Sequence, residues 1–295
     1  MHSPHASDAI TVSEDDRQIV LSTPAFCYVL SKHTALWTKL CYEGRHLLEK
    51  PMEFNIWRAP TANDGHIAQH WRRAGYHRSI PYAYHTGYEM LETGAVKVQS
   101  HLCLTALAVQ KIMDIQLTWT VHPSGEIYAS MQVTKDPEFP ELPRFGVRMF
   151  LPESMDQVNY FGMGPMESYP DKHRASSHGM YASAVADMHE DYLVPQENGS
   201  HWDCDYVMVQ GGNSVLTIAG EKAFSFNISH YTQEELTEKT HNFELVPSGY
   251  TVLCVDYSQN GIGSASCGPG PGEEFKFKEQ EFTFDFRIVV GSYLP

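Results

Sequence analysis

Short runs in which apolar and polar residues alternate recur along almost the whole chain. The clearest is residues 281–290, where the apolar side chains from Phe282 to Val290 occupy every second position and polar residues such as Asp285 stand between them. A period of two places alternate side chains on opposite faces of a β-strand. Turn residues separate such runs from about residue 18 onward, so we expect about sixteen antiparallel strands.

Two segments have a helical pattern instead. In the first, Ile67, Trp71 and Ala74 form one apolar stripe that ends at a glycine. In the second, Thr232 and Glu235 have the spacing of a capping box. These two short helices do not alternate with the strands, so the pattern predicts an all-β fold, a large sandwich of two antiparallel sheets.

The N-terminal residues differ from the rest. Residues 1–17 are rich in Ser, His and Asp, which is typical of a flexible leader or linker. The strand pattern then continues without a linker, so we expect residues 18–295 to form one β-sandwich domain.

Composition narrows the possible partners. The chain of 295 residues has 21 basic and 36 acidic residues, a net charge of −15, which argues against binding to nucleic acid but not to a neutral sugar. No apolar run is long enough to cross a bilayer, and the N-terminus has no signal-peptide core. We therefore expect a soluble, cytoplasmic protein without a membrane partner. The six scattered cysteines predict free, mostly buried thiols.

Four segments combine turns with charged side chains. They are residues 54–65 (FNIWRAPTANDG), residues 160–176 (YFGMGPMESYPDKHRAS), residues 188–207 (MHEDYLVPQENGSHWDCDYV), and residues 226–236 together with 261–271 (GIGSASCGPGP). Their candidate site residues are Arg58, Asn63, Asp64, Glu167, Tyr169, Asp171, Lys172, His173, Glu197 and Asn198.

In this order the segments resemble the C-terminal domain, or separate small chain, of the family 2 β-galactosidases. The first is similar to the family's Trp-Arg-Ala-Pro-Thr-Asp-Asn-Asp, the second to Gly-x-Gly-Pro-x-Glu-Asn-Tyr-x-Asp-Arg, and the third to Pro-x-Glu-Asn-Gly. This chain has Ala62 in place of Asp, Ser168 in place of Asn and Lys172 in place of Arg. The last two substitutions resemble the two-chain enzymes of the family.

The resemblance implies a galactose-mutarotase-like supersandwich that packs against a larger chain or domain in an oligomeric complex. It also implies hydrolysis of terminal β-D-galactosides such as lactose by two glutamates of a (β/α)8 barrel. The present chain has no βα alternation that could build a barrel, so we expect it to supply no catalytic residue and to be inactive alone. We expect no cofactor on it; the resemblance assigns Mg²⁺ or Na⁺ to the catalytic partner.

The acids of the four segments also have local interpretations. Glu167 and Asp171 are expected to pair with Lys172 or Arg174 or to cap a turn. Glu197 and Asn198 are expected to satisfy a turn, and the pair 63–64 to cap the helix after Gly65. The histidines at positions 66 and 70 have helical spacing but no third ligand, so we expect no metal site.

The best candidate for contact with a substrate is the loop of residues 261–269. Its Gly and Pro residues predict an irregular excursion between strands, of the kind that often delivers side chains to a neighbouring site. We take Gly263, Ser264, Ser266 and Cys267 as candidates for the substrate entrance. The resemblance implies a sugar-stacking Trp in the single-chain enzymes; the nearest counterpart here is Cys267.

Two other functions remain open at this stage. One is a stand-alone enzyme like the aldose epimerases, which would need a His acid and a Glu or Asp base that converge. The other is a carbohydrate-binding or assembly module that uses exposed aromatic residues such as Trp57, Trp71, Trp202 and Tyr169.

Overall fold

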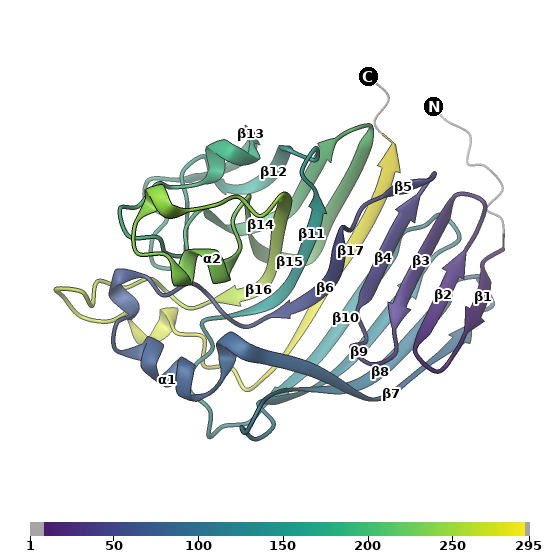
Figure 1. Ribbon diagram of the computed structural model, residues 1–295, viewed down its shortest axis with the longest axis horizontal. Coiled ribbons are helices and arrows are strands. Elements are labelled where there is room, and N and C mark those ends of the chain that lie inside the picture. Colours follow the sequence, from purple (N-terminus) through teal and green to yellow (C-terminus); the bar gives the residue numbers. More distant parts are fainter. Residues whose placement is uncertain (1–8, 293–295) are drawn as a thin grey trace.

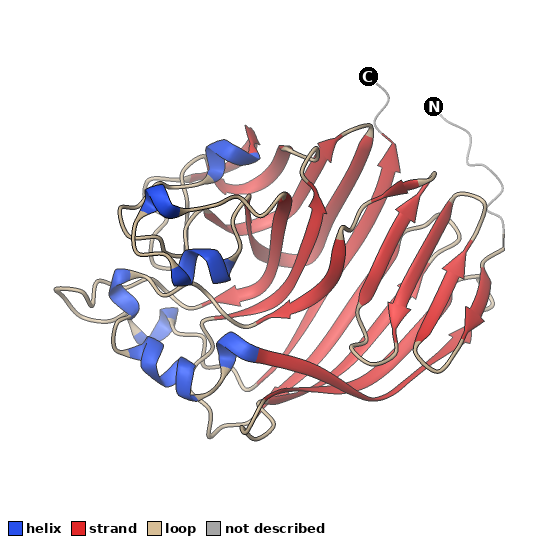
Figure 2. Cartoon of the chain, viewed as in Figure 1, coloured by secondary structure: helices blue, strands red, loops and turns tan. Residues whose placement is uncertain are grey.

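The computed structural model describes residues 9–292 and shows two antiparallel β-sheets that pack face to face (Figure 1). Strands dominate the molecule, and the short helices gather at one end (Figure 2). The predicted all-β, antiparallel architecture is therefore confirmed.

The smaller sheet has five strands in sequence order. They are β1 (Thr11–Glu14), β2 (Gln18–Ser22), β3 (Phe26–Ser31), β4 (Trp37–Tyr42) and β5 (Arg45–His46). Strand β1 corrects the predicted leader, because Thr11 pairs with Ser22 and Ile10 is buried. The β-branched residues at positions 10–12 are enough to form an edge strand in spite of their polar neighbours. Residues 1–8 of the predicted leader lie outside the described residues.

The larger sheet has twelve strands and branches at β15. The first half of β15 pairs with β17, and the second half of β15 pairs with β16. Strand β16 in turn pairs with β11, and β11 pairs with β6. The main path runs β13-β12-β14-β15-β17-β10-β9-β8-β7. The strands are β6 (Lys50–Asn55), β7 (Ser79–Met90), β8 (Val96–Ala106), β9 (Met113–Val121), β10 (Ile127–Lys135), β11 (Arg144–Pro152), β12 (Gln157–Gly164), β13 (Ser177–Ala184), β14 (Ser200–Gly211), β15 (Ser214–Ser229), β16 (Tyr250–Gln259) and β17 (Glu281–Ser292).

The core lies between the two sheets. Trp37 of β4 meets Trp119 of β9 edge to face, with 5.6 Å between the ring centroids, and the Trp119 indole N–H donates to the carbonyl of Ala35. The predicted alternation in β17 is confirmed, since the apolar residues at every second position from Phe282 to Val290 are buried, whereas Val289 between them is exposed. Aromatic pairs of this kind anchor one sheet on the other.

Both predicted helices are present. Helix α1 (Ile67–Arg73) is followed by Gly75 in the left-handed conformation, and α2 (Gln233–Glu238) is capped by Thr232, whose hydroxyl accepts from the N–H of Glu235. Both are far too short to span a bilayer, as is every helix in residues 9–292. The 3₁₀ turns are η1 (Ala62–Asp64), η2 (Tyr76–Arg78), η3 (Val185–Met188), η4 (Asn242–Glu244) and η5 (Glu273–Phe275).

All six cysteines are free, as predicted, but not all are buried. Cys103, Cys204 and Cys254 are buried, whereas Cys267 is exposed on a loop.

Candidate functional site

Arg58 connects the first family segment to the 261–271 loop. Its guanidinium is fully buried, forms an ion pair with Asp64 at 2.6 Å, and donates to the carbonyls of Asn260 and Gly261 at 2.6 and 3.0 Å. The prediction that residues 63–64 cap α1 is therefore wrong. The Asp64 carboxylate instead accepts from Arg58 and Thr61, because a buried guanidinium needs a counter-ion.

The second correction concerns Glu197. It does not serve its own turn, because the side chain is fully buried and accepts from Arg144 Nη1 at 2.5 Å and from the N–H of Ala59 at 3.1 Å. Asn198 behaves as predicted, since its amide donates to the nearby carbonyl of Gln196. A loop residue of the third segment thereby joins a strand residue and the first segment.

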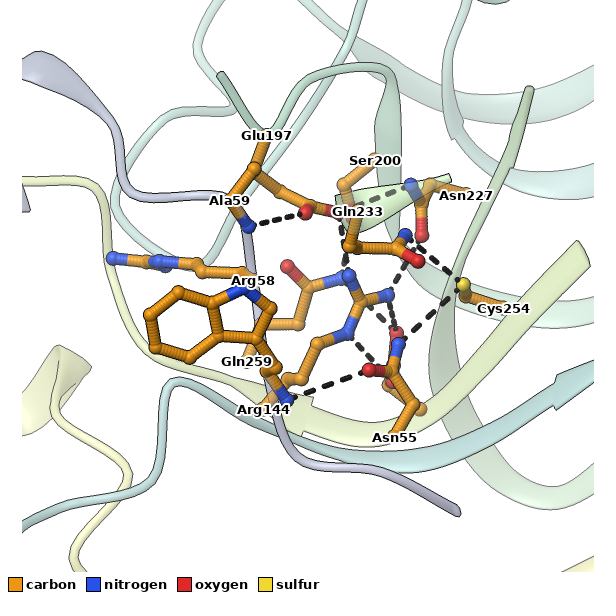
Figure 3. A network of polar contacts seen from close by, with 12 residues as sticks. Asn55, Arg58, Ala59, Arg144, Glu197, Ser200, Asn227, Gln233, Cys254 and Gln259 are labelled. Atoms are coloured by element: carbon orange, nitrogen blue, oxygen red, sulfur yellow. Dashed lines mark hydrogen bonds and ion pairs between the residues drawn. The ribbon is translucent and has the colours of Figure 1, made fainter. Parts of the chain in front are cut away.

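Arg144 is the centre of a buried polar cluster (Figure 3). The guanidinium also bonds both oxygens of Asp256, at 3.0 and 2.5 Å, and the side-chain oxygen of Asn227 at 2.7 Å. Gln259 donates to Asp256 at 3.2 Å. These five residues (Arg144, Glu197, Asn227, Asp256 and Gln259) are called the Arg144 cluster below.

Burial and the neighbouring carboxylates together set the pKa values of groups in and beside this cluster. Burial alone would lower the pKa of Arg144, but the carboxylates of Asp256 and Glu197 hold that pKa well above its usual value. Burial raises the pKa of the Cys254 thiol nearby to about 12, which keeps it protonated and unreactive. The cluster therefore holds β11, β15, β16 and the third segment together, and its groups are closed to solvent.

Asp171 fixes the base of the 261–271 loop. Its carboxylate accepts from the backbone N–H groups of Ile262 and Gly263, at 2.8 and 2.7 Å. Of the two predicted roles, an ion pair or a turn cap, Asp171 therefore takes the second, on a loop that is distant in sequence. A Cβ atom at Gly261 would lie only 2.8 Å from this carboxylate, so glycine is required there for the close approach.

Asn63 holds the same loop from the first segment. Its amide donates to the carbonyl of Gly263 at 2.9 Å, and its oxygen accepts from the N–H of Ser266 at 3.1 Å. Ala62, which replaces an acid of the family pattern, donates its N–H to the side chain of Gln196. The first and second family segments thus both bind the backbone of the same loop.

The predicted ion pair of Glu167 with Lys172 is confirmed. The same carboxylate also accepts from the Tyr192 hydroxyl and, at 2.9 Å, from the N–H of Gly199, which joins the second segment to the third. His173 stacks on Trp202 with 4.7 Å between ring centroids.

The expected platform of exposed aromatic residues is wrong. Trp57, Trp71 and Tyr169 are buried in the core, and Trp202 is half-buried under His173. Large aromatic side chains gain more from burial than from exposure, so a pattern cannot assign them to a surface.

The tip of the 261–271 loop is the part exposed to solvent. Ser264, Ser266 and Cys267 are exposed, whereas Gly263 lies at the anchored base with φ +65°. The loop projects from the helical end of the molecule (Figure 1). Contact of these four residues with a substrate stays a prediction.

Sequence reasoning missed Arg144, Asp256 and Gln259. The available signal was a charged residue inside an otherwise apolar strand, as in RFGVRMF and VLCVDYS. Such a charge must find a buried partner. Among residues 9–292 no group of three His, Cys, Asp or Glu side chains is placed to hold a metal ion.

Comparisons with known proteins place the chain in a family. The family model described as β-galactosidase small chain matches residues 22–288. The chain is 39% identical over 258 residues to a β-galactosidase of Actinobacillus pleuropneumoniae, covering 88% of this chain and 25% of that protein. It is 33% identical over 281 residues to a β-galactosidase of Staphylococcus xylosus, covering 95% of this chain and 28% of that protein. The chain therefore spans about a quarter of the length of these relatives.

The fold is shared with a galactose 1-epimerase of Lactobacillus acidophilus. The two structures superpose with a TM-score of 0.54 at 7% sequence identity, over 96% of this chain and 98% of the other. This likeness confirms the galactose-mutarotase-like supersandwich. The sequence match over almost the whole chain then identifies the family: this protein belongs to the β-galactosidase small-chain family.

Proposed function

We propose that this chain forms the small-chain part of a β-galactosidase and works with a larger chain or domain that carries the catalytic glutamates. The substrates are terminal β-D-galactosides such as lactose. The proposal rests on the family and on the chain's length, which is about a quarter of that of its relatives. Any Mg²⁺ or Na⁺ of the enzyme is assigned to the larger chain or domain.

The described residues lack the elements for hydrolysis. Retaining glycosidases place two carboxyl groups about 5 Å apart on either side of the glycosidic bond. Glu197 and Asp256 are fully buried, and each is bound to Arg144. All strand pairs in residues 9–292 are antiparallel, whereas a (β/α)8 barrel needs parallel strands. The catalytic pair is therefore assigned to the partner.

One observation carries the proposed role of this chain: the family segments fix the 261–271 loop through its backbone, while the side chains at its tip stay exposed. Loops fixed in this way commonly supply residues to a neighbouring site. We assign Gly263, Ser264, Ser266 and Cys267 to the wall of the partner's substrate entrance. Cys267 offers little surface for stacking on a sugar, so the loop acts as a wall.

An apolar patch beside this loop is proposed as the docking surface. Leu193, Val194, Phe243 and Val246 are each more than 60% exposed. The N–H of Asn242 donates to the carbonyl of Leu193, which fixes the two halves of the patch together. Helix α2, which precedes Phe243, lies at the same end of the molecule as the 261–271 loop (Figure 1). Exposed apolar side chains that cluster in this way mark protein interfaces.

A stand-alone epimerase is less compatible with the site. That chemistry needs an accessible His and an accessible carboxylate. His201 is buried; burial lowers its pKa to about 4, and its ring packs against Tyr160 and Phe226. Glu197 and Asp256 are also closed to solvent and bound to Arg144, so neither can act as the base beside His201.

Reconstitution tests the proposal. The A. pleuropneumoniae relative without the quarter that matches this chain serves as the partner. Neither protein alone should hydrolyse nitrophenyl β-galactoside, and their mixture should. A Phe243→Asp variant should weaken assembly, whereas Leu107→Asp, an equally exposed site on the β8–β9 turn, should not. Hydrolysis by this chain alone, abolished by one Glu or Asp substitution in it, would contradict the proposal.

A further inference from the structure

The outer face of β7–β10, which points away from the five-stranded sheet, is polar across several neighbouring strands. The antiparallel register places His85, His101, Gln116 and Gln132 in one row that crosses all four strands. The neighbouring positions on each strand face the other way; Leu117, which follows Gln116, is buried in the core. The alternation of a β-strand therefore brings these four polar side chains together on one surface.

The adjacent row has smaller residues at three of its four positions. It contains Gly87, Thr118 and Ser130 together with Gln99, which are again register partners. The long side chains of the first row rise beside this low row and leave a hollow of about 570 Å³. That volume is within the range of about 300–1,000 Å³ of small-ligand sites.

Gly87 is important for the shape of the hollow. A Cβ atom added at this position would lie 3.2 Å from Nε2 of His85, so a larger residue would displace the imidazole. Tyr88 and Glu89 complete the wall on the outermost strand. The hollow is thus formed by the sequence of small and large side chains on the sheet.

The glutamines of the hollow have no partner in the protein. Within residues 9–292 the side-chain amides of Gln99, Gln116 and Gln132 form no hydrogen bond with another protein group. By contrast, the amides of Gln233 and Gln259 on the loop side of the molecule bond to protein atoms. Each free amide offers two N–H donors and one acceptor oxygen.

The charges around the hollow favour a neutral ligand. The one carboxylate of its lining, Glu89, forms an ion pair with Lys97 at 3.0 Å. The chain as a whole has a net charge of −15, which repels anions. At the border, Tyr84 packs on His101 with 5.0 Å between ring centroids and offers an aromatic surface.

We propose that this hollow is a carbohydrate-binding site for short, neutral oligosaccharides, separate from the 261–271 loop. Amide and hydroxyl groups match the many hydroxyls of a sugar, and the aromatic border matches the apolar face of its ring. All of the residues lie on this chain, so the inference does not depend on hydrolysis or on a partner.

Titration of the isolated chain with lactose and with a neutral galactotriose tests the proposal. In NMR spectra the side-chain amide signals of Gln99, Gln116 and Gln132 should shift as sugar is added. The double substitution Gln116→Ala/Gln132→Ala should weaken binding about tenfold, since it removes two hydrogen-bonding groups. Gln157→Ala, at an exposed position on the distant strand β12, is the matched control and should bind as the unaltered chain does.

A second variant tests the shape instead of the chemistry. Ser130→Phe should fill the floor of the hollow and abolish the shifts while the rest of the spectrum, and thus the fold, is retained. Sialyllactose, which is anionic, should bind more weakly than lactose. The proposal is overturned if the glutamine signals do not move, if only signals of the 261–271 loop move, or if the double variant binds as tightly as the control.

Discussion

The Arg144 cluster and the hollow on β7–β10 are both built mainly of polar side chains on the same twelve-stranded sheet, but they differ in what those side chains bond. In the cluster, Arg144 is saturated by carboxylates and an amide and is closed to solvent. In the hollow, Gln116 and Gln132 have no partner in the protein. Saturated polar groups hold a fold together, and open ones are available to a ligand.

The largest expected effect comes from opening the cluster. Arg144→Met should lower the free energy of unfolding by about 3–5 kcal/mol, because it leaves the carboxylates of Glu197 and Asp256 buried without a counter-ion. Urea unfolding followed by tryptophan fluorescence measures the loss. Arg174→Met, at an exposed arginine in the second segment, is the control and should change the free energy by less than about 0.5 kcal/mol. A loss of less than about 1 kcal/mol for Arg144→Met would mean that the cluster does not support the fold.

The next effect depends on pH. Burial lowers the pKa of His201 to about 4, and its Nδ1–H donates to the carbonyl of Met163. A depressed pKa in the folded state means that stability is present above the unfolded pKa of about 6.5 and is lost as the pH falls toward 4. The unfolded chain takes up the proton first, and this residue should account for roughly 3 kcal/mol of the loss.

Urea unfolding at pH 7 and at pH 4.5 tests the role of His201. His201→Phe should have a smaller loss of stability between the two pH values than the unaltered chain. The same substitution at the exposed His46 should leave the pH dependence unchanged. Identical pH dependence in the His201 variant and the unaltered chain would place the acid sensitivity elsewhere.

A smaller effect is expected at the base of the 261–271 loop. Asp171→Asn replaces a carboxylate that accepts two backbone bonds with a neutral amide that keeps one acceptor oxygen. Hydrogen exchange at the amides of Ile262 and Gly263 should become about tenfold faster, while the free energy of unfolding falls by only about 1 kcal/mol. Asp187→Asn, at an exposed position on η3, should not change the exchange. Unchanged protection in the Asp171 variant would show that the loop is held by other contacts.

The smallest effect on stability is expected in the hollow on β7–β10. Gln116→Ala/Gln132→Ala should change the free energy of unfolding by less than about 0.5 kcal/mol, since neither amide bonds to the protein. Thermal and urea unfolding of the double variant measure this. A loss larger than about 1 kcal/mol would mean that these glutamines serve the fold in the same way as the Arg144 cluster.

The difference between local and long-range contacts explains which features the sequence could predict. Alternation predicted the sheets, and the capping box at Thr232 predicted α2, because both signals are local. Glu197 was assigned to its own turn, yet its partner Arg144 is 53 residues away, and Asp256 is 112 residues from that arginine. Contacts between residues so far apart in the chain leave no recognisable spacing in the sequence, so no motif predicts them. The family resemblance drew attention to these segments, but the contacts by which they fix a loop could be found only in the structure.

In the proposed function, the segments of this chain hold the 261–271 loop at the substrate entrance of a partner. Steady-state kinetics of the reconstituted complex test it most directly, with the unaltered chain and with a chain in which residues 264–268 are removed. Shortening an exposed tip should leave this domain folded and assembled. We expect KM to rise or kcat to fall by about tenfold relative to the unaltered complex, with Cys267→Ala changing either value much less. Unchanged KM and kcat in a fully assembled, loop-shortened complex would contradict the claim and reduce the loop to a connection between strands.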